Sequence, residues 1–268
     1  MKTADRIITS VIYLFLYAPL LVMVFFSFNA SSSTSVFSGF SLKWYGELAR
    51  KQDVVVALRN TLTLAALSSV IATLLGTLAA VGIFNLKSKV AKSAMMTVTN
   101  IPMMNPDIVT GVSLMLLFVF IGHLVRAQQS LSFVTLLIAH ITFNLPYVIL
   151  NVLPKLRQTD PRLYEAAQDL GAPPLKAFFK VVLPSIMPGV VSGLMMAFTL
   201  SLDDFVISYY TNGTGFQTLP LMIFSMTKKK VKPDMYALST LIFLTILALL
   251  LLSNIVQARA DKKKQQQL

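Results

Sequence analysis

Residues 154–184, PKLRQTDPRLYEAAQDLGAPPLKAFFKVVLP, form a polar segment between two apolar stretches, 132–153 and 185–209. Each stretch exceeds the about 20 residues that an α-helix needs to cross the hydrocarbon core of a bilayer. The polar segment would then join two membrane-spanning helices on one side of the membrane. This arrangement indicates an all-α integral membrane protein.

Four further apolar stretches surround this region, at 7–28, 60–84, 94–122 and 237–256. Hydrophobic residues make up 55% of the 268 residues and charged residues 13%, whereas a soluble domain has about 25% charged residues. So little charge excludes a soluble enzyme, and the absence of cysteine excludes a disulfide scaffold. The sequence predicts six transmembrane helices. The first should be a retained anchor, because it is longer than the roughly 7–15 residues of a cleavable signal core.

Basic residues predict the orientation of these helices. With a cytoplasmic N-terminus, the inner segments hold 14 of the 23 Lys and Arg residues and the outer segments hold nine. Because basic residues concentrate in cytoplasmic loops, we predict that both termini are cytoplasmic. Four lysines on the predicted outer side argue against this orientation: Lys228, Lys229, Lys230 and Lys232. They are interpreted as a solvated or lipid-facing patch, or as a docking site for an external partner.

The polar segment contains start and stop signals for a short helix. Thr159-Asp160-Pro161 provides a capping side chain followed by a proline, which suits the first helical position. Gly171 can adopt the left-handed conformation that ends helices, and two prolines follow it. A helix at about 161–171 is predicted. Such a short, rigid helix at the membrane surface suits a groove on another protein.

A spaced motif overlaps this helix. Glu165-Ala166-Ala167 is followed by three residues, Gly171, nine residues and then Val-Val-Leu-Pro at 181–184. The pattern resembles the EAA loop of ABC-importer permeases, which has Ile at the place of Val181. The resemblance implies a type I ABC-importer permease bundle (MetI-like), in which this loop is the coupling helix that docks into the ATPase subunit. The residues expected to couple to the ATPase are Glu165, Ala166, Ala167, Asp169 and Gly171.

The sequence contains no phosphate-binding motif of the form G-x-x-x-x-G-K-[ST]. The chain is therefore not expected to be an enzyme that hydrolyses ATP by that route, and no cofactor is expected on it. A separate ATPase would use the ATP and Mg²⁺. The resemblance implies the same division between chains.

Three acidic residues lie inside predicted spans: Asp107, Asp203 and Asp204. Ionisable groups within a membrane are costly and mark transport paths. Because no Lys or Arg lies deep in a span, we expect the cation to come from the solute, a metal or protons. Asp107 follows Asn105-Pro106, an order that also fits the N-terminus of a broken helix. Adjacent Asp203 and Asp204 would point about 100° apart on one helix, so one of them could cap locally instead.

A polar face follows the stretch 132–153. His140, Asn144, Tyr147 and Asn151 are spaced four, three and four residues apart, which places them on one side of a helix. Polar residues in a span face the interior of the bundle. We therefore add Asn144 and Tyr147 to the three acids as residues of a substrate path. His140 is interpreted as a packing residue, with a proton relay as the alternative.

Four segments resemble one subunit of a polyamine importer, the second of its two permeases: KWY at 43–45, NPDIV at 105–109, HITFNLP at 140–146 and FTLSLDDFVISYYTNG at 198–213. The resemblance implies uptake of spermidine or putrescine, whose ammonium groups would face the acids. It also implies a second, unlike permease subunit, two copies of the ATPase and a periplasmic polyamine-binding protein. The location would be the inner membrane of a bacterium, in contact with lipid.

The predicted organisation has three parts. Residues 1–56 would form the N-terminal span and a periplasmic loop, 57–256 the permease domain, and 257–268 a basic cytoplasmic tail.

Other functions stay open as alternatives. An ABC permease for another solute is possible, although the lack of basic residues within the spans disfavours an anion. An intramembrane enzyme could use Asp203, Asp204 or His140 as acid and base, but adjacent aspartates on one helix do not converge. A secondary transporter would not need the EAA helix. Nucleic acid is not expected as a partner, since no basic stripe alternates with aromatic residues.

Overall fold

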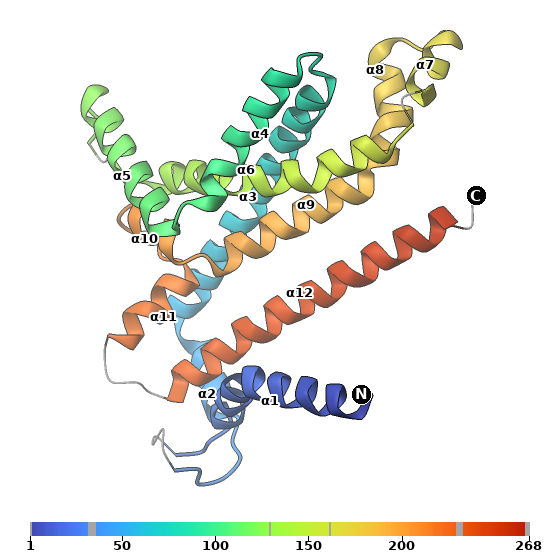
Figure 1. Ribbon diagram of the computed structural model, residues 1–268. Helices are drawn as coiled ribbons and strands as arrows, with labels where there is room; N and C mark the ends of the chain where they lie inside the picture. Colours follow the sequence, from blue (N-terminus) through green and yellow to red (C-terminus); the bar gives the residue numbers. More distant parts are fainter. Residues whose placement is uncertain (1, 32–35, 129, 161, 229–232, 266–268) are drawn as a thin grey trace. The chain divides into compact units, whose positions relative to one another are not determined.

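The computed structural model describes residues 2–31, 36–128, 130–160, 162–228 and 233–265. Within these ranges the chain is helical, and its β-structure is limited to one isolated bridge between Asn29 and Phe40 (Figure 1). The predicted all-α class is confirmed. The helices are α1 Lys2–Ser27, α2 Lys43–Arg50, α3 Gln52–Asn85, α4 Lys89–Met104, α5 Asp107–Leu124, α6 Phe133–Gln158, α7 Arg162–Asp169, α8 Pro174–Ala177, the π-helical turn η1 Phe178–Val182, α9 Leu183–Asp203, α10 Val206–Thr211, α11 Leu219–Thr227 and α12 Pro233–Gln265.

Five helical segments are long and apolar enough to cross a membrane: Asp5–Ser27, Gln52–Asn85, Asp107–Leu124, Phe133–Gln158 and Pro174–Asp203. The sixth predicted span, 237–256, falls on α12, whose described apolar part, Asp234–Ala248, is shorter. The count of six spans and the cytoplasmic position of both termini remain predictions. Three lysines of the predicted outer cluster, Lys229, Lys230 and Lys232, lie outside the described residues.

Two of the predicted spans are interrupted. In 94–122, α4 ends at Met104 and α5 begins at Asp107, so the break expected at Pro106 is confirmed. The stretch 185–209 is also broken, because α9 ends at Asp203 and α10 begins at Val206. The prediction that both aspartates lie on one helix is therefore wrong. Asp204 has extended backbone angles (φ −62°, ψ 123°).

The contacts divide the chain into two compact units, 1–58 with 219–248, and 59–218 with 249–268. In the first unit, Trp44 of α2 is buried, and its indole N–H donates to the carbonyl of Asn29 at 2.7 Å. The ammonium of Lys51 lies 2.6 Å from the buried carboxylate of Asp234. Trp44 and its neighbours thus form an internal core of this unit.

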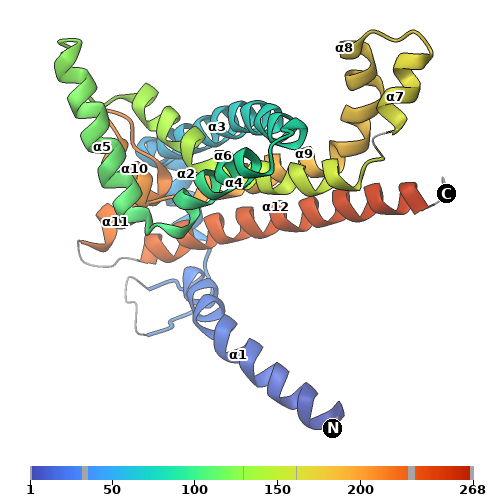
Figure 2. The same cartoon turned by 45° about the horizontal axis from the view of Figure 1, so that its top comes forward.

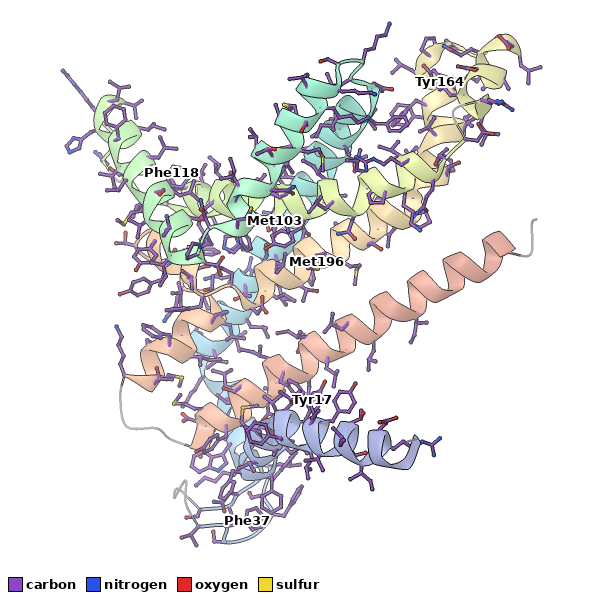
Figure 3. The ribbon with its side chains drawn as sticks, viewed as in Figure 1. Tyr17, Phe37, Met103, Phe118, Tyr164 and Met196 are labelled. Atoms are coloured by element: carbon purple, nitrogen blue, oxygen red, sulfur yellow. The ribbon has the colours of Figure 1, made fainter. Side chains whose placement is uncertain are left out.

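In the second unit, α5 and α10 pack on the N-terminal half of α6. Phe118 of α5, labelled in Figure 3, forms a buried cluster with Ala139 and Phe143 of α6 and Ile207 of α10. Gly111 permits the close approach of α10, since a Cβ atom at that position would lie 3.0 Å from the Tyr210 ring. These contacts fix the two short pieces that come after the helix breaks.

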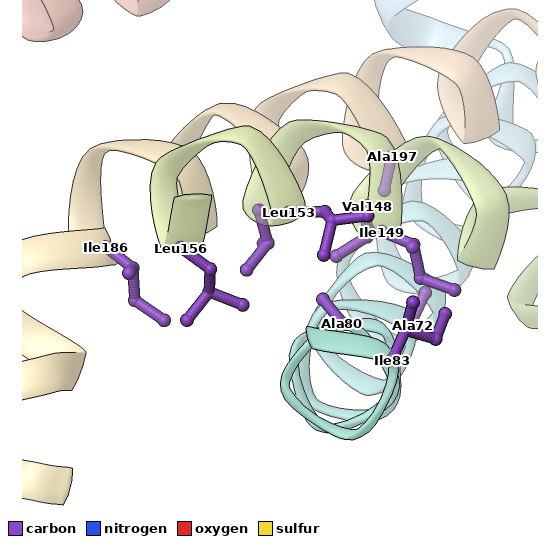
Figure 4. Close-up of a cluster of buried hydrophobic side chains, with 10 residues drawn as sticks. Ala72, Ala80, Ile83, Val148, Ile149, Leu153, Leu156, Ile186 and Ala197 are labelled. Atoms are coloured by element: carbon purple, nitrogen blue, oxygen red, sulfur yellow. The ribbon is translucent and has the colours of Figure 1, made fainter. Parts of the chain in front are cut away.

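The main core of the second unit lies between α3, α6 and α9 (Figure 4). Helices α6 and α9 run side by side in both Figure 1 and Figure 2. The buried side chains of this core are Ala72, Ala80, Ile83, Val148, Ile149, Val152, Leu153, Leu156, Ile186 and Ala197. In a membrane protein such contacts stabilise through close packing, because lipid tails are as apolar as the core.

Small residues recur at every fourth position of α9: Gly189, Gly193, Ala197 and Ser201. A Cβ atom on Gly189 would lie 2.7 Å from the carbonyl oxygen of Asn151 on α6, and one on Gly193 would lie 3.3 Å from Val148 Cα. Spacing of small residues at every fourth position brings helix backbones together in membranes. The row on α9 therefore sets the close approach of α9 to α6.

Candidate functional site

Helix α7 is fixed at both ends. Before its first turn, the carboxylate of Asp160 accepts a hydrogen bond from the backbone N–H of Arg162 at 3.0 Å. After its last turn, Gly171 has φ +82°, and its N–H donates to the carbonyl of Gln168 at 2.8 Å. The predicted capping residue and the predicted stop are both confirmed. The helix itself covers Arg162–Asp169, slightly less than the expected 161–171, and Pro161 lies outside the described residues.

The predicted coupling residues lie on an open surface. Glu165, Ala166, Asp169 and Gly171 are exposed, and Ala167 is half-buried. Beside them, Leu170 is 89% exposed, so it does not pack against its own chain as a buried residue would. Apart from the partly covered Ala167, these residues are accessible from outside the chain.

A pocket of about 550 Å³ separates α7 from the ends of α3 and α6. Tyr164, labelled on α7 in Figure 3, and Glu165 lie on its wall. The other lining residues are Val81, Phe84, Asn85, Leu156, Thr159, Asp160, Leu163, Pro174, Leu175, Phe178 and Val182. Helix α7 therefore stands away from the bundle, held mainly through the chain segments on either side of it.

A buried polar network centres on His140 of α6. Its side chain is fully buried, and Nδ1 lies 3.1 Å from the hydroxyl of Ser201 on α9. Its Nε2 lies 3.0 Å from the hydroxyl of Ser208 on α10 and 3.4 Å from Oδ2 of Asp204. The interpretation of His140 as a packing residue agrees with these contacts, since each ring nitrogen has a partner.

Two further residues extend the network. The amide of Asn144, also on α6, donates to the Ser201 hydroxyl at 2.7 Å, and the hydroxyl of Ser68 on α3 lies 2.9 Å from the same atom. Ser201 thus links three helices. Sequence reasoning missed these serines, although Ser201 continues the row of small residues on α9.

Asp204 is the N-terminal cap of α10. Its Oδ1 accepts from the backbone N–H of Ile207 at 3.1 Å, and its Oδ2 accepts from the backbone N–H and the hydroxyl of Ser208, both at 2.8 Å. These bonds compete with continuation of α9 and explain the break. The sequence predicts that the cation of each acid comes from outside the protein, but the side chain of Asp204 is 7% exposed and lies beside the His140 ring.

Asp107 and Asp203 differ from Asp204. Both are exposed, and in the part of the chain that the structure describes neither forms an ion pair. Asp107 is the first residue of α5, where the helix dipole favours a carboxylate. The structure thus leaves two accessible acids, while Asn144 and Asp204 lie in the buried network.

Comparisons with known proteins place this geometry in a family. Residues 72–266 match the family described as "Binding-protein-dependent transport system inner membrane component". The chain is 40% identical to the putrescine transport system permease protein PotI of Escherichia coli K12, over 94% of this chain and 90% of that protein. It is 39% identical to the spermidine/putrescine transport system permease protein PotC of Haemophilus influenzae, over 92% and 93%.

Solved structures show the same fold. A chain of a bacterial ABC transporter involved in the import of the acidic polysaccharide alginate superposes with a TM-score of 0.71, at 17% identity, over 96% of this chain and 95% of that one. A chain of the MetNI methionine ABC transporter in inward-facing conformations superposes with a TM-score of 0.61, at 17% identity, over 82% of this chain and 99% of that one.

Proposed function

The chain belongs to the family of binding-protein-dependent transport system inner membrane components, and on this premise we propose that it is a permease subunit of an ATP-driven importer of polyamines. The observation that carries the proposal is a pair of exposed carboxylates, Asp107 and Asp203, that have no cation of their own among the described residues. Putrescine and spermidine, which appear in the names of two relatives of this chain, are linear polycations. Such a solute would supply the missing positive charge.

The proposed path includes the five residues predicted from the sequence. Asp107 and Asp203 offer charge, Tyr147 offers a half-buried aromatic ring, and Asn144 and Asp204 lie behind this surface in the buried network. Carboxylates and an aromatic ring together suit an ammonium group with methylene spacers. Binding along such a path should be modest, because tight binding would slow release.

The proposed assembly supplies the parts that this chain lacks. It contains a second, unlike permease subunit, two copies of an ATPase that uses ATP and Mg²⁺, and a periplasmic polyamine-binding protein, in the inner membrane of a bacterium. The absence of a phosphate-binding motif from the sequence supports a separate ATPase. The exposed Leu170 and the exposed acids of α7 support a docking surface for that ATPase.

The proposed coupling uses the connections of α7. On one side α7 follows α6, and on the other side it leads through α8 and η1 into α9. Movement of α7 by the ATPase would therefore act on two helices that pack along each other through Gly189 and Gly193. The opposite ends of α6 and α9 carry His140, Asp203 and the rest of the polar region, so the pair can transmit movement to the path.

Transport by the reconstituted complex tests the proposal. The complete transporter, with its ATPase, second permease and binding protein, should take up radiolabelled putrescine or spermidine into vesicles only with ATP. An excess of unlabelled polyamine should compete, whereas sulfate and a neutral sugar should not. ATP-dependent uptake of another solute without uptake of either polyamine would contradict the proposed substrate.

A further inference from the structure

The adjacent aspartates at the end of α9 have different surroundings, and these surroundings show which of the two caps locally. We propose that Asp203 contacts the transported cation, whereas Asp204 and His140 form a positioning pair that holds the helix break and α10 in place. This inference rests on the proposed function and deepens it by assigning one role to each acid.

The hydrogen bonds of Asp204 occupy most of its carboxylate. A carboxylate has about four lone-pair sites. Oδ1 receives the N–H of Ile207, and Oδ2 receives two donors from Ser208 and faces His140 at 3.4 Å. With its side chain 7% exposed, Asp204 is also shielded from solvent. Its carboxylate is therefore part of the protein's own structure.

The direction of the hydrogen bonds assigns a proton to His140. The hydroxyl hydrogen of Ser208 goes to Asp204, so the Ser208 oxygen can only accept from the imidazole. His140 must then donate from Nε2. That N–H points its positive end toward the region of the buried carboxylate. The partner of Asp204 is therefore internal.

Asp203 has the complementary properties. It is the last residue of α9, its side chain is exposed, and no cation lies within 4.0 Å of it in the described ranges. An exposed carboxylate at the end of a spanning helix is available to a passing ammonium group. Of the two acids, only Asp203 can exchange water for substrate without breaking the network.

The positioning pair also controls the helix that comes after the break. Asp204 caps α10, and α10 carries Tyr209, which is 48% exposed and whose ring centroid lies 5.6 Å from that of Phe205. Aromatic faces attract ammonium groups. Loss of the cap would therefore displace the aromatic rings of α10 as well as the backbone of Asp203.

Single cysteines test the assignment, because the chain has no cysteine of its own. Asp203→Cys and Asp204→Cys are introduced separately into the complete transporter and treated with a cationic methanethiosulfonate reagent, with and without spermidine. We expect Asp203→Cys to react and to be protected by spermidine. Asp204→Cys should react at least about ten times more slowly, as expected for a buried thiol. Asp53→Cys, at an exposed position of α3, is the control that reacts without protection.

A second variant separates positioning from simple stability. Both variants are made in the Asp203→Cys background, and labelling is expressed per assembled complex. His140→Leu should abolish protection by spermidine. His140→Gln keeps a hydrogen-bond donor and should retain part of the protection. A purely structural role for His140 would lower the amount of complex but leave protection per complex unchanged, and would overturn the positioning role. Protection of Asp204→Cys instead of Asp203→Cys would overturn the assignment of the acids. Absence of polyamine uptake by the unsubstituted complex would overturn the proposed function, and this inference with it.

Discussion

Nε2 of His140 lies 3.4 Å from Oδ2 of Asp204, and neither side chain is more than 7% exposed. The contact joins α6 to the break after α9. Helix α7 lies between α6 and α9 in the sequence, and the contact is at the other end of each helix, the N-terminal end of α6 and the C-terminal end of α9. Burial of a charged group is costly unless it is paired and hydrogen-bonded, and Asp204 satisfies both conditions only with the elements α6 and α10 in place. The break therefore depends on a contact with α6 as well as on the local bonds of Asp204 to α10.

Removal of the imidazole should destabilise the protein. His140→Leu leaves Asp204 with its bonds to Ile207 and Ser208 but without a basic partner, and we expect the free energy of unfolding to fall by about 3 kcal/mol. Thermal unfolding of the purified complex in detergent measures the change. His123→Leu, at an exposed position in the last turn of α5, is the matched control and should have little effect. Equal melting temperatures for the two variants would contradict the role of the pair.

The features that the sequence predicted correctly depend on local signals. The ends of α7 follow from Asp160 and Gly171, and the break before α5 follows from Pro106. In each case a residue changes the conformation of its immediate neighbours, so no knowledge of the remaining fold is required. The identity of the family followed from the same region.

The features that it missed depend on contacts between distant residues. Ser68 and Ser201, whose hydroxyls lie 2.9 Å apart, are 133 positions apart in the chain. The sequence predicts local capping by one of the two aspartates as an alternative, and the bonds of Asp204 to Ile207 and Ser208 are of this kind. The contact of Asp204 with His140 of α6 is the part that joins distant residues. Without knowledge of which helices meet, His140 could not be recognised as the partner of one particular acid.

Close packing of α6 and α9 should be required for transport. In Gly189→Ala the new methyl group would lie 2.7 Å from the carbonyl oxygen of Asn151, so the helices must separate. Overpacking of this kind costs about 1–3 kcal/mol, and we expect both a lower melting temperature and slower uptake per complex. Gly82→Ala is the control, because a Cβ atom at Gly82 meets no atom within 4 Å. If both variants transported at the rate of the unsubstituted protein, the packing of α9 on α6 would not transmit the movement.

Reversal of charge on α7 should separate ATP hydrolysis from uptake. Glu165 is exposed on α7. Glu165→Lys should leave the chain inserted in the membrane but lower uptake by at least about tenfold. The reason is that a reversed charge at an interface is repelled by the group that the original charge attracted. Gln168→Lys places a lysine at an exposed position of the same helix without removing a carboxylate, and it serves as the control. The measurements are uptake, ATP hydrolysis by the complex and copurification of the ATPase. Unchanged uptake together with normal ATPase association in Glu165→Lys would exclude a coupling role for this residue.

Neutralisation of Asp107 should slow transport without affecting assembly. The carboxylate is exposed at the start of α5, and it does not form an ion pair with any of the described residues, so its loss costs the fold little. A cation that crosses the path would lose one favourable contact, and we expect Asp107→Asn to lower the rate of polyamine uptake about tenfold at saturating binding protein. Asp53→Asn, at an exposed position of α3, is the matched control. A normal uptake rate in Asp107→Asn, or an equal loss in both variants, would show that the carboxylate does not contact the substrate.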